Sequence, residues 1–384
     1  MIDKLTSLIM EAMGSAIKPI VSEELSDGTI KSLYETAKNQ DMVHLVGSAI
    51  LKYAKDFPEN EYFKKFKKQF MIAVLRYEKL QYLYNEITDL FEKEKIPFLP
   101  LKGSVIRRYY PEPWMRTSCD IDILIHEQDL ERAQDLITDV LHLTPSGRTR
   151  HDVSFDAANG VHFELHHSLI EDNVLDKADL PLTRVWDYTK STEGKTYEHE
   201  LSPEMFYYYH IAHMAKHFVN GGCGMRPFLD IHVFRKNVTF DEAIVKALLT
   251  EGGLLTFAEK AETLSKVWFE SLPHTDLTKA MEVYLLEGGT YGTIESYVAM
   301  QQKKRGGKLR YLFSRFFLSF ESLATIYPSL KKHRWLYPIF QVRRWFRLLL
   351  PGKMKRSMHE FKINQNTSND SIAAAGNLLK ELEL

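Results

Sequence analysis

Between Asp120 and Ile125 the sequence reads DIDILI, a run in which acidic and branched apolar side chains alternate. An alternation with a period of two predicts a β-strand. On such a strand Asp120 and Asp122 share one face, while Ile121 and Ile123 share the other and must face a hydrophobic core. The two carboxylates therefore lie side by side, where they repel each other unless a cation lies between them.

The segments around this strand predict a small sheet with helices packed on it. A short apolar run, PFLPL, ends in Lys-Gly-Ser and is typical of a strand that leads into a turn. Pro111 and Pro113 end the helix that follows. Asn159-Gly160 favours the turn of a hairpin. In chain order we expect a helix at 105–110, a strand at 119–125, a helix at 129–141 and hairpin strands at 151–156 and 161–167.

A third carboxylate is expected to join the two aspartates. Glu164 stands between Phe163 and Leu165, so it faces away from the core. If its strand lies beside the acidic strand, three carboxylates converge, and such a cluster holds divalent metal ions for in-line displacement at phosphorus. Oxygen ligands favour Mg²⁺ or Mn²⁺ over zinc. A one-residue change of register would turn Glu164 away, and Asp152 and Asp156 are then the competing third acids.

Helical patterns precede and follow this region. The run from Tyr62 to Lys95 repeats apolar residues at three- and four-residue steps, which predicts one long amphipathic helix. Five more helices are expected at 203–219, 226–236, 240–250, 254–270 and 276–286. We therefore expect an α+β fold. It comprises an N-terminal helical region (1–95), a core with a small mixed β-sheet (96–201) and a C-terminal helical region (202–384) that contains a basic segment (303–356).

The residues just before the first helix of the sheet region have the properties of a phosphate site. Gly103 lets the backbone approach a phosphate closely, and the N–H groups at the start of the following helix attract an anion. Ser104 can donate to a phosphate oxygen. Lys102, or Arg116 just before the acidic strand, can balance the charge of a triphosphate.

Taken in this order, the motifs resemble those of the polymerase-β-type nucleotidyltransferase superfamily. More narrowly, LPLKGSVIRRYYPEPWMRTSCDIDILIHEQDLERAQDLI and the later Glu164-Leu165-His166 are similar to a group of uncharacterised nucleotidyltransferase family proteins. The resemblance covers roughly residues 60–235. It implies that the sheet region is a nucleotidyltransferase core.

The resemblance also implies roles for the motif residues. Asp120, Asp122 and Glu164 are expected to bind Mg²⁺ or Mn²⁺, and Gly103-Ser104 to bind the phosphates of ATP or another NTP. Glu164 either completes this metal site or acts as the general base on the acceptor hydroxyl. The implied reaction moves NMP to a hydroxyl group and releases pyrophosphate, on an acceptor that is a small molecule, a protein or RNA. In a departure from the usual superfamily spacing, fifteen residues separate Ser104 from Asp120, which weakens the assignment of the two basic phosphate ligands.

Several further polar residues are candidates for substrate contact. The similar proteins have a histidine-bearing helix before an arginine and an aspartate, matched here by His213, His217, Arg226 and Asp230. The two histidines have the i, i+4 spacing of zinc ligands, but the sequence offers no third ligand, so a packed or substrate-facing pair is the better interpretation. Arg226 and Asp230 form either an ion pair or, through the arginine, a phosphate contact. His166 either contacts substrate or is a half-buried strand histidine.

Charge is distributed unevenly along the chain. The formal net charge is −1, yet residues 303–356 contain fifteen Lys and Arg and one acid, so this segment carries +14 and the rest carries −15. Large aromatic side chains alternate with these cations. The segment could bind nucleic acid by phosphate contact and stacking, or lie on an anionic membrane. We favour a third interpretation, in which the aromatic residues form a helical core and the basic residues flank the acidic lobe.

Cysteine content and hydropathy argue against a disulfide-rich, zinc-structured or membrane-spanning protein. Cys119 and Cys223 provide neither a disulfide framework nor a four-ligand zinc site, and alternation predicts that Cys119 is buried. No stretch approaches the roughly 18–20 apolar residues of a membrane span. We expect a cytoplasmic nucleotidyltransferase. The alternative is a non-catalytic protein that binds nucleotide, or that contacts nucleic acid or membrane through its basic segment.

Overall fold

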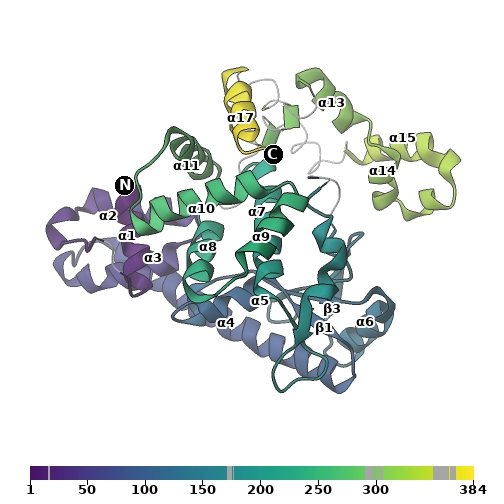
Figure 1. Ribbon diagram of the computed structural model, residues 1–384, viewed down its shortest axis with the longest axis horizontal. Helices are drawn as coiled ribbons and strands as arrows, with labels where there is room; N and C mark the ends of the chain where they lie inside the picture. Colours follow the sequence, from purple (N-terminus) through teal and green to yellow (C-terminus); the bar gives the residue numbers. More distant parts are fainter. Residues whose placement is uncertain are drawn as a thin grey trace.

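A computed structural model describes residues 1–15, 18–170, 175, 177–289, 297–298, 301–302, 306–348, 363 and 369–384. The fold is a mostly helical α+β fold with a five-stranded mixed sheet, as the sequence predicts (Figure 1). In the part of the chain that the structure describes, no helix is long and apolar enough to cross a bilayer.

The five-stranded sheet carries the acidic strand near its middle. The strand order is β1 (Phe98–Pro100), β2 (Asp120–Ile125), β5 (His162–His166), β4 (Asp152–Asp156) and β3 (Thr144–Arg148). β2 and β5 run parallel, and the other neighbours run antiparallel. The predicted hairpin is therefore confirmed as β4 and β5. Strand β3 was not predicted, because its residues TPSGR are all exposed and show no apolar alternation.

Strand alternation separates a core face of the sheet from a polar face. Ile121, Ile123, Phe163 and Leu165 pack in one hydrophobic cluster with residues of α4 (Glu61–Lys93) and α6 (Leu130–Asp139). The intervening side chains of β2, β5 and β4 therefore face the other way. Strand β2 begins at Asp120, and Cys119 just before it is exposed, so the expectation that it is buried is wrong.

Most of the predicted helices form close to their expected bounds. They include α7 (Pro203–Val219), α8 (Arg226–Asn237), α9 (Glu242–Glu251), α10 (Leu255–Glu270) and α11 (Asp276–Gly288). The helix expected at 105–110 instead begins at Lys102. It forms one α-helical stretch, α5 (Lys102–Ile106), and continues as a 3₁₀ turn over Arg107–Tyr109. The chain leaves helical geometry at Tyr110 because the next residue is a proline.

A second hydrophobic core joins the two ends of the chain. The N-terminal helices α1 (Ile2–Ala12), α2 (Asp27–Asn39) and α3 (Val43–Ile50) share this core with α7 to α11. Its largest fully buried side chains include Tyr207, Phe218, Phe228 and Phe257. This core holds α7 and α8 in place, and these helices contribute residues opposite the polar face of the sheet.

In its described part, residues 306–348, the basic segment forms the short α-helices α13 (Lys308–Phe316), α14 (Phe320–Ile326) and α15 (Tyr337–Leu348). They lie apart from the sheet in Figure 1. Leu323, Tyr327 and Leu330 are buried in a small core there. Phe313 and Phe346 are 66% and 68% exposed, so the expectation that the aromatic residues form a core is wrong for these side chains. Positions 303–305 and 349–356 of the predicted segment lie outside the described residues.

Candidate functional site

The polar face of the sheet brings together the predicted carboxylates. In the parallel β2–β5 ladder Asp122 is directly opposite Glu164, and Asp120 is opposite His162. Ligand atoms of Asp122, Glu164 and His166 lie within 4.8 Å of one another. The register on which the assignment of Glu164 depended therefore places it next to the aspartate strand, with its side chain on the same face.

A cavity of about 400 Å³ lies over this face. Its floor comes from β2, β4 and β5, and α7 and α8 contribute the opposite wall. Among the residues predicted for the site, those that line it are Lys102, Gly103, Arg116, Asp120, Glu164, His166, His213, His217, Arg226 and Asp230. Ser104 is not among the lining residues, whereas Ser118, which the sequence analysis did not select, is.

Asp122 is buried beneath this cavity and is held by two nitrogen donors. It is 2% exposed. Its Oδ1 accepts from Lys102 Nζ at 2.7 Å and lies 2.9 Å from His166 Nε2. Burial alone would raise the pKa of Asp122, but the Lys102 ammonium and His166 hold that pKa well below its usual range. Asp122 is therefore an ionised carboxylate with a fixed orientation.

Asp120 has the opposite electrostatic environment. Burial and the neighbouring charge of Asp122 raise the pKa of Asp120, and Glu164 adds to this effect. These acids are close enough to repel one another, and Lys102 compensates only part of that repulsion. A donor set of carboxylate oxygens under such repulsion fits a divalent cation of the Mg²⁺ type.

Gly103 lies so close to the side chain of Ser118 that a larger residue would not fit there without a shift. A Cβ atom on Gly103 would lie 3.1 Å from Ser118 Cβ, tighter than ordinary van der Waals contact. Ser118 is itself fixed, because its Oγ accepts from Arg107 at 2.7 Å and donates to the Asp120 carbonyl at 3.1 Å. The space that the glycine provides is thus used by the chain before β2. Since α5 has only five residues, its N-terminus also attracts anions less than a long helix would.

Arg116 is tied into a buried ion pair. Its Nε donates to the two carboxylate oxygens of Asp230 at 2.7 and 3.0 Å. Asp230 is fully buried and also accepts from Tyr110 Oη at 2.7 Å. Burial would raise the pKa of Asp230, and Arg116 holds that pKa below its usual value. Arg116 reaches the cavity wall as part of this network, which leaves it less free to follow a phosphate.

Arg226 is paired with Asp41 and not with Asp230. Its guanidinium donates to Asp41 Oδ2 at 2.9 Å and to the Thr117 carbonyl at 3.1 Å. Of the two interpretations of Arg226 and Asp230, the ion pair is wrong, because Asp230 is occupied by Arg116 from a distant part of the chain. The side chain of Arg226 lines the cavity. It is placed to contribute positive charge there.

One face of α7 supplies the wall above the carboxylates. The Nε2 atoms of His213 and His217 are 3.0 Å apart, as in a packed pair that shares one proton. Burial lowers the pKa of His213 well below its usual value. Tyr209 and Lys216 lie on the same face and were missed from sequence. Burial and the charge of Lys102 lower the pKa of Lys216 to about 8. The residues of this face recur at steps of three and four, and this spacing in the sequence could have identified Tyr209 and Lys216 as neighbours of the two histidines.

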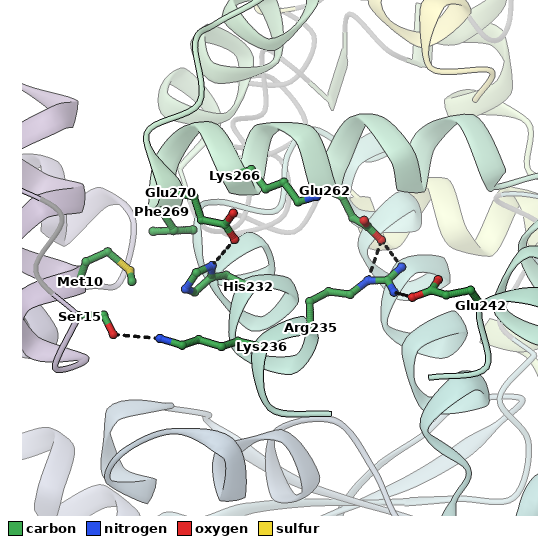
Figure 2. Close-up of a pocket in the computed structure, with 10 residues that line it drawn as sticks. All are labelled: Met10, Ser15, His232, Arg235, Lys236, Glu242, Glu262, Lys266, Phe269 and Glu270. Atoms are coloured by element: carbon green, nitrogen blue, oxygen red, sulfur yellow. Dashed lines mark hydrogen bonds and ion pairs between the residues drawn. The ribbon is translucent and has the colours of Figure 1, made fainter. Parts of the chain in front are cut away.

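A second hollow, of about 670 Å³, lies between α1, α8, α9 and α10 (Figure 2). Each of its three acids is paired with a basic side chain. Arg235 contacts Glu262 and Glu242, His232 contacts Glu270, and Lys236 donates to Ser15. Such mutual pairing is typical of a structural network. The cavity over the sheet is the better candidate for chemistry.

A family model matches the part of the chain that carries this cavity. The model of a family described as uncharacterised nucleotidyltransferase matches residues 26–270. This range includes the sheet, α7 and α8 and therefore every side chain of the cavity named above. No curated protein and no solved structure matches the chain significantly.

Proposed function

The chain belongs to the family of uncharacterised nucleotidyltransferases, and from this membership we propose that it transfers NMP from an NTP to a hydroxyl-bearing acceptor. One observation supports this most strongly. Asp120, Asp122 and Glu164 share one face of a mixed sheet, beneath a cavity whose other wall carries cations. Acids for a metal ion and cations for phosphates are the two requirements of nucleotidyl transfer.

Asp120 and Asp122 are the residues that would hold Mg²⁺ or Mn²⁺, and Glu164 lies directly opposite Asp122 on the neighbouring strand. When bound, the divalent ion neutralises phosphate charge and favours the displacement at the α-phosphorus. Asp122 is ionised and already oriented by Lys102 and His166. Little rearrangement of this carboxylate is then needed when substrate binds.

Lys102, Lys216 and Arg226 are proposed to bind the triphosphate. All three line the cavity. Lys102 is held at a left-handed backbone conformation, with φ of 45°, which directs its side chain from the start of α5 to Asp122. Lys216 extends from α7 on the opposite wall. A triphosphate between the walls would therefore meet positive charge from two sides.

Glu164 is proposed to take the proton of the acceptor hydroxyl. It is more accessible than Asp122, because 27% of its side-chain surface is exposed whereas that of Asp122 is 2% exposed. The acceptor oxygen then forms a bond to the α-phosphorus, and the bond from that phosphorus to the bridging oxygen breaks. Pyrophosphate leaves with the bonding electron pair, and the proton remains on Glu164.

The test is pyrophosphate release from each of the four NTPs, with Mg²⁺ and a pool of hydroxylated metabolites, proteins and RNA. We expect release with at least one NTP and a loss of at least about 100-fold in Asp120→Asn and Asp122→Asn. Asp156→Asn is the matched control, since Asp156 lies on the same polar face but is exposed and accepts from His162. Equal release by wild type and the two site variants would refute the proposal.

A further inference from the structure

A second group of metal-ligating side chains lies beside the three acids. His151, Asp152 and His166 each offer one ligand atom, and these atoms lie within 4.8 Å of one another. Asp152 is directly opposite His166 in the β4–β5 ladder, so strand register makes them neighbours. The rings of His151 and His166 are nearly parallel, with 6.1 Å between centroids and 14° between planes. The fold thus brings two imidazoles and one carboxylate together.

Asp152 has a buried oxygen that has no partner among the residues that the structure describes. The residue is 4% exposed. Its Oδ2 accepts from Thr149 Oγ1 at 2.8 Å and lies 2.9 Å from His151 Nε2. Among the described residues, Oδ1 has no hydrogen-bond partner. Buried carboxylate oxygens are rarely left unsatisfied in proteins, so this atom indicates a ligand that the protein chain does not supply.

His166 makes the hydrogen bond to a carboxylate that metal-bound histidines usually make. Its Nε2 lies 2.9 Å from Asp122 Oδ1, and in the neutral imidazole a hydrogen bond donated from Nε2 to this oxygen leaves the lone pair on Nδ1. Metal-bound histidines usually donate their other N–H to a carboxylate in this way, because that bond fixes the tautomer and the ring plane. Asp122 is therefore one of the proposed catalytic acids and also fixes the ring of His166, which belongs to the group formed with His151 and Asp152.

We propose that His151, Asp152 and His166 form a second metal site, for a transition-metal ion such as Zn²⁺ or Co²⁺. Two imidazole nitrogens and one carboxylate suit these ions, whereas Mg²⁺ prefers oxygen ligands alone. Through His166 the bound ion fixes the position of Asp122. The site does not depend on nucleotide transfer and would exist equally in a chain that only binds nucleotide.

Co²⁺ is the probe, because its visible absorption distinguishes a site of low coordination number from the six-coordinate aqueous ion. The full-length protein is freed of metal, placed in excess Mg²⁺ and titrated with Co²⁺. We expect one equivalent to bind with a visible band, and Asp152→Asn and His151→Gln to weaken binding at least about tenfold. Asp156→Asn, on the same strand, should bind as wild type. Circular dichroism identifies variants that have not folded.

Asp120→Asn separates this site from the proposed active site. Retention of the Co²⁺ band in Asp120→Asn, with loss in Asp152→Asn, supports the second site even if no nucleotide transfer is found. Loss in Asp120→Asn together with retention in Asp152→Asn places the ion on the acids and overturns the proposal. Wild type that binds no Co²⁺ in excess Mg²⁺ also overturns it.

A different observation carries a second inference, about the basic C-terminal helices. Two apolar stripes, one on α13 and one along α15 and the turn before it, face solvent. Side chains in each recur at steps of three and four residues, which places them on one helix face. The stripes consist of Leu309, Phe313 and Phe316 on α13, and of Trp335, Ile339, Val342 and Phe346 along α15, all of them exposed.

Exposed cations flank both apolar stripes. Residues 306–348 contain nine Lys and Arg against the single acid Glu321. Arg310 and Arg315 are exposed on α13, and Arg343 and Arg347 on α15. An apolar stripe bordered by cations matches the boundary between anionic headgroups and acyl chains.

We propose that the two apolar stripes and their cations bind the surface of an anionic lipid bilayer. Leu309, Ile339 and Val342 favour lipid over single-stranded nucleic acid, because aliphatic side chains do not stack on bases. The shared positive charge of this region disfavours pairing with a second copy of itself. Trp335, 72% exposed, is the kind of side chain that settles at a membrane interface.

The test is co-sedimentation of the full chain with vesicles of phosphatidylcholine alone or with 30% phosphatidylglycerol. We expect binding to the anionic vesicles that weakens with salt, and a loss of at least about tenfold in Phe313→Ser/Phe346→Ser and in Arg343→Gln/Arg347→Gln. Leu75→Ser/Tyr82→Ser is the matched control, because these side chains are equally exposed on α4. Tight binding to single-stranded RNA without vesicle binding would overturn the proposal. So would a dimer that depends on Phe313 and Phe346.

Discussion

Replacing Asp230 by asparagine tests whether Arg116 belongs to the structural framework of the site. Asp230 is fully buried, and the side chain of Arg116 is 12% exposed. The distance between Arg116 Nε and Asp230 Oδ1 is 2.7 Å. Removing the negative charge leaves a buried guanidinium without its counter-charge. Breaking a buried pair from one side typically costs about 3–5 kcal/mol, so we expect Asp230→Asn to lower the free energy of unfolding by that amount.

Urea unfolding followed by circular dichroism measures this change. Arg116→Met/Asp230→Asn should be less destabilised than the sum of the single variants by at least about 1 kcal/mol, because the double variant has no unpaired charge. Asp241→Asn is the control, since Asp241 caps α9 through Ala243 N and asparagine caps equally well. A loss below about 1 kcal/mol in Asp230→Asn would show that Arg116 does not depend on this carboxylate.

Three further predictions concern the floor and the surroundings of the cavity. Lys102→Met removes the cation that lies 2.7 Å from Asp122, and it should lower kcat/KM for the NTP about 100-fold in steady-state kinetics. A thermal shift assay should show that this variant is folded. Gly103→Ala brings a Cβ to 3.1 Å from Ser118 and should cost about 1–3 kcal/mol in urea unfolding; a neutral effect would mean that the loop relaxes. Burial lowers the pKa of His44 to about 4, below its unfolded value of 6.5, so the unfolded chain binds a proton that the folded chain does not. Stability should therefore fall as pH drops from 6.5 toward 4, by about 2 kcal/mol from this residue at pH 5, and His44→Gln should remove that part of the urea-unfolding pH dependence.

The acidic strand could be predicted from sequence because its pattern is local. Alternation in DIDILI fixed which side chains share a face, and the isoleucines fixed which face is buried. Glu164 followed from the same argument on β5, once the parallel register with β2 was known. Strand β3 could not be predicted in this way, because both of its faces are exposed and no apolar period marks it.

The remaining side chains of the cavity depend on contacts between distant segments. Lys216 and Tyr209 reach the carboxylates only because the second hydrophobic core holds α7 over the sheet. The partner of Arg116 lies 114 positions along the chain, so the nearer Arg226 was the more obvious ion-pair partner for Asp230 in sequence. Likewise, the exposed stripes of α13 and α15 could not be told from core-facing stripes by periodicity.

The position of the label in the product tests the proposed reaction most directly. The protein is incubated with Mg²⁺, the acceptor pool and one NTP that carries ³²P at either the α- or the γ-phosphate. Nucleotidyl transfer predicts label on the acceptor from the α-labelled NTP only, release of the γ-label as pyrophosphate, and loss of both signals in Asp120→Asn. Transfer of the γ-label to the acceptor, or α-label transfer that persists in Asp120→Asn, would contradict the assignment of this site.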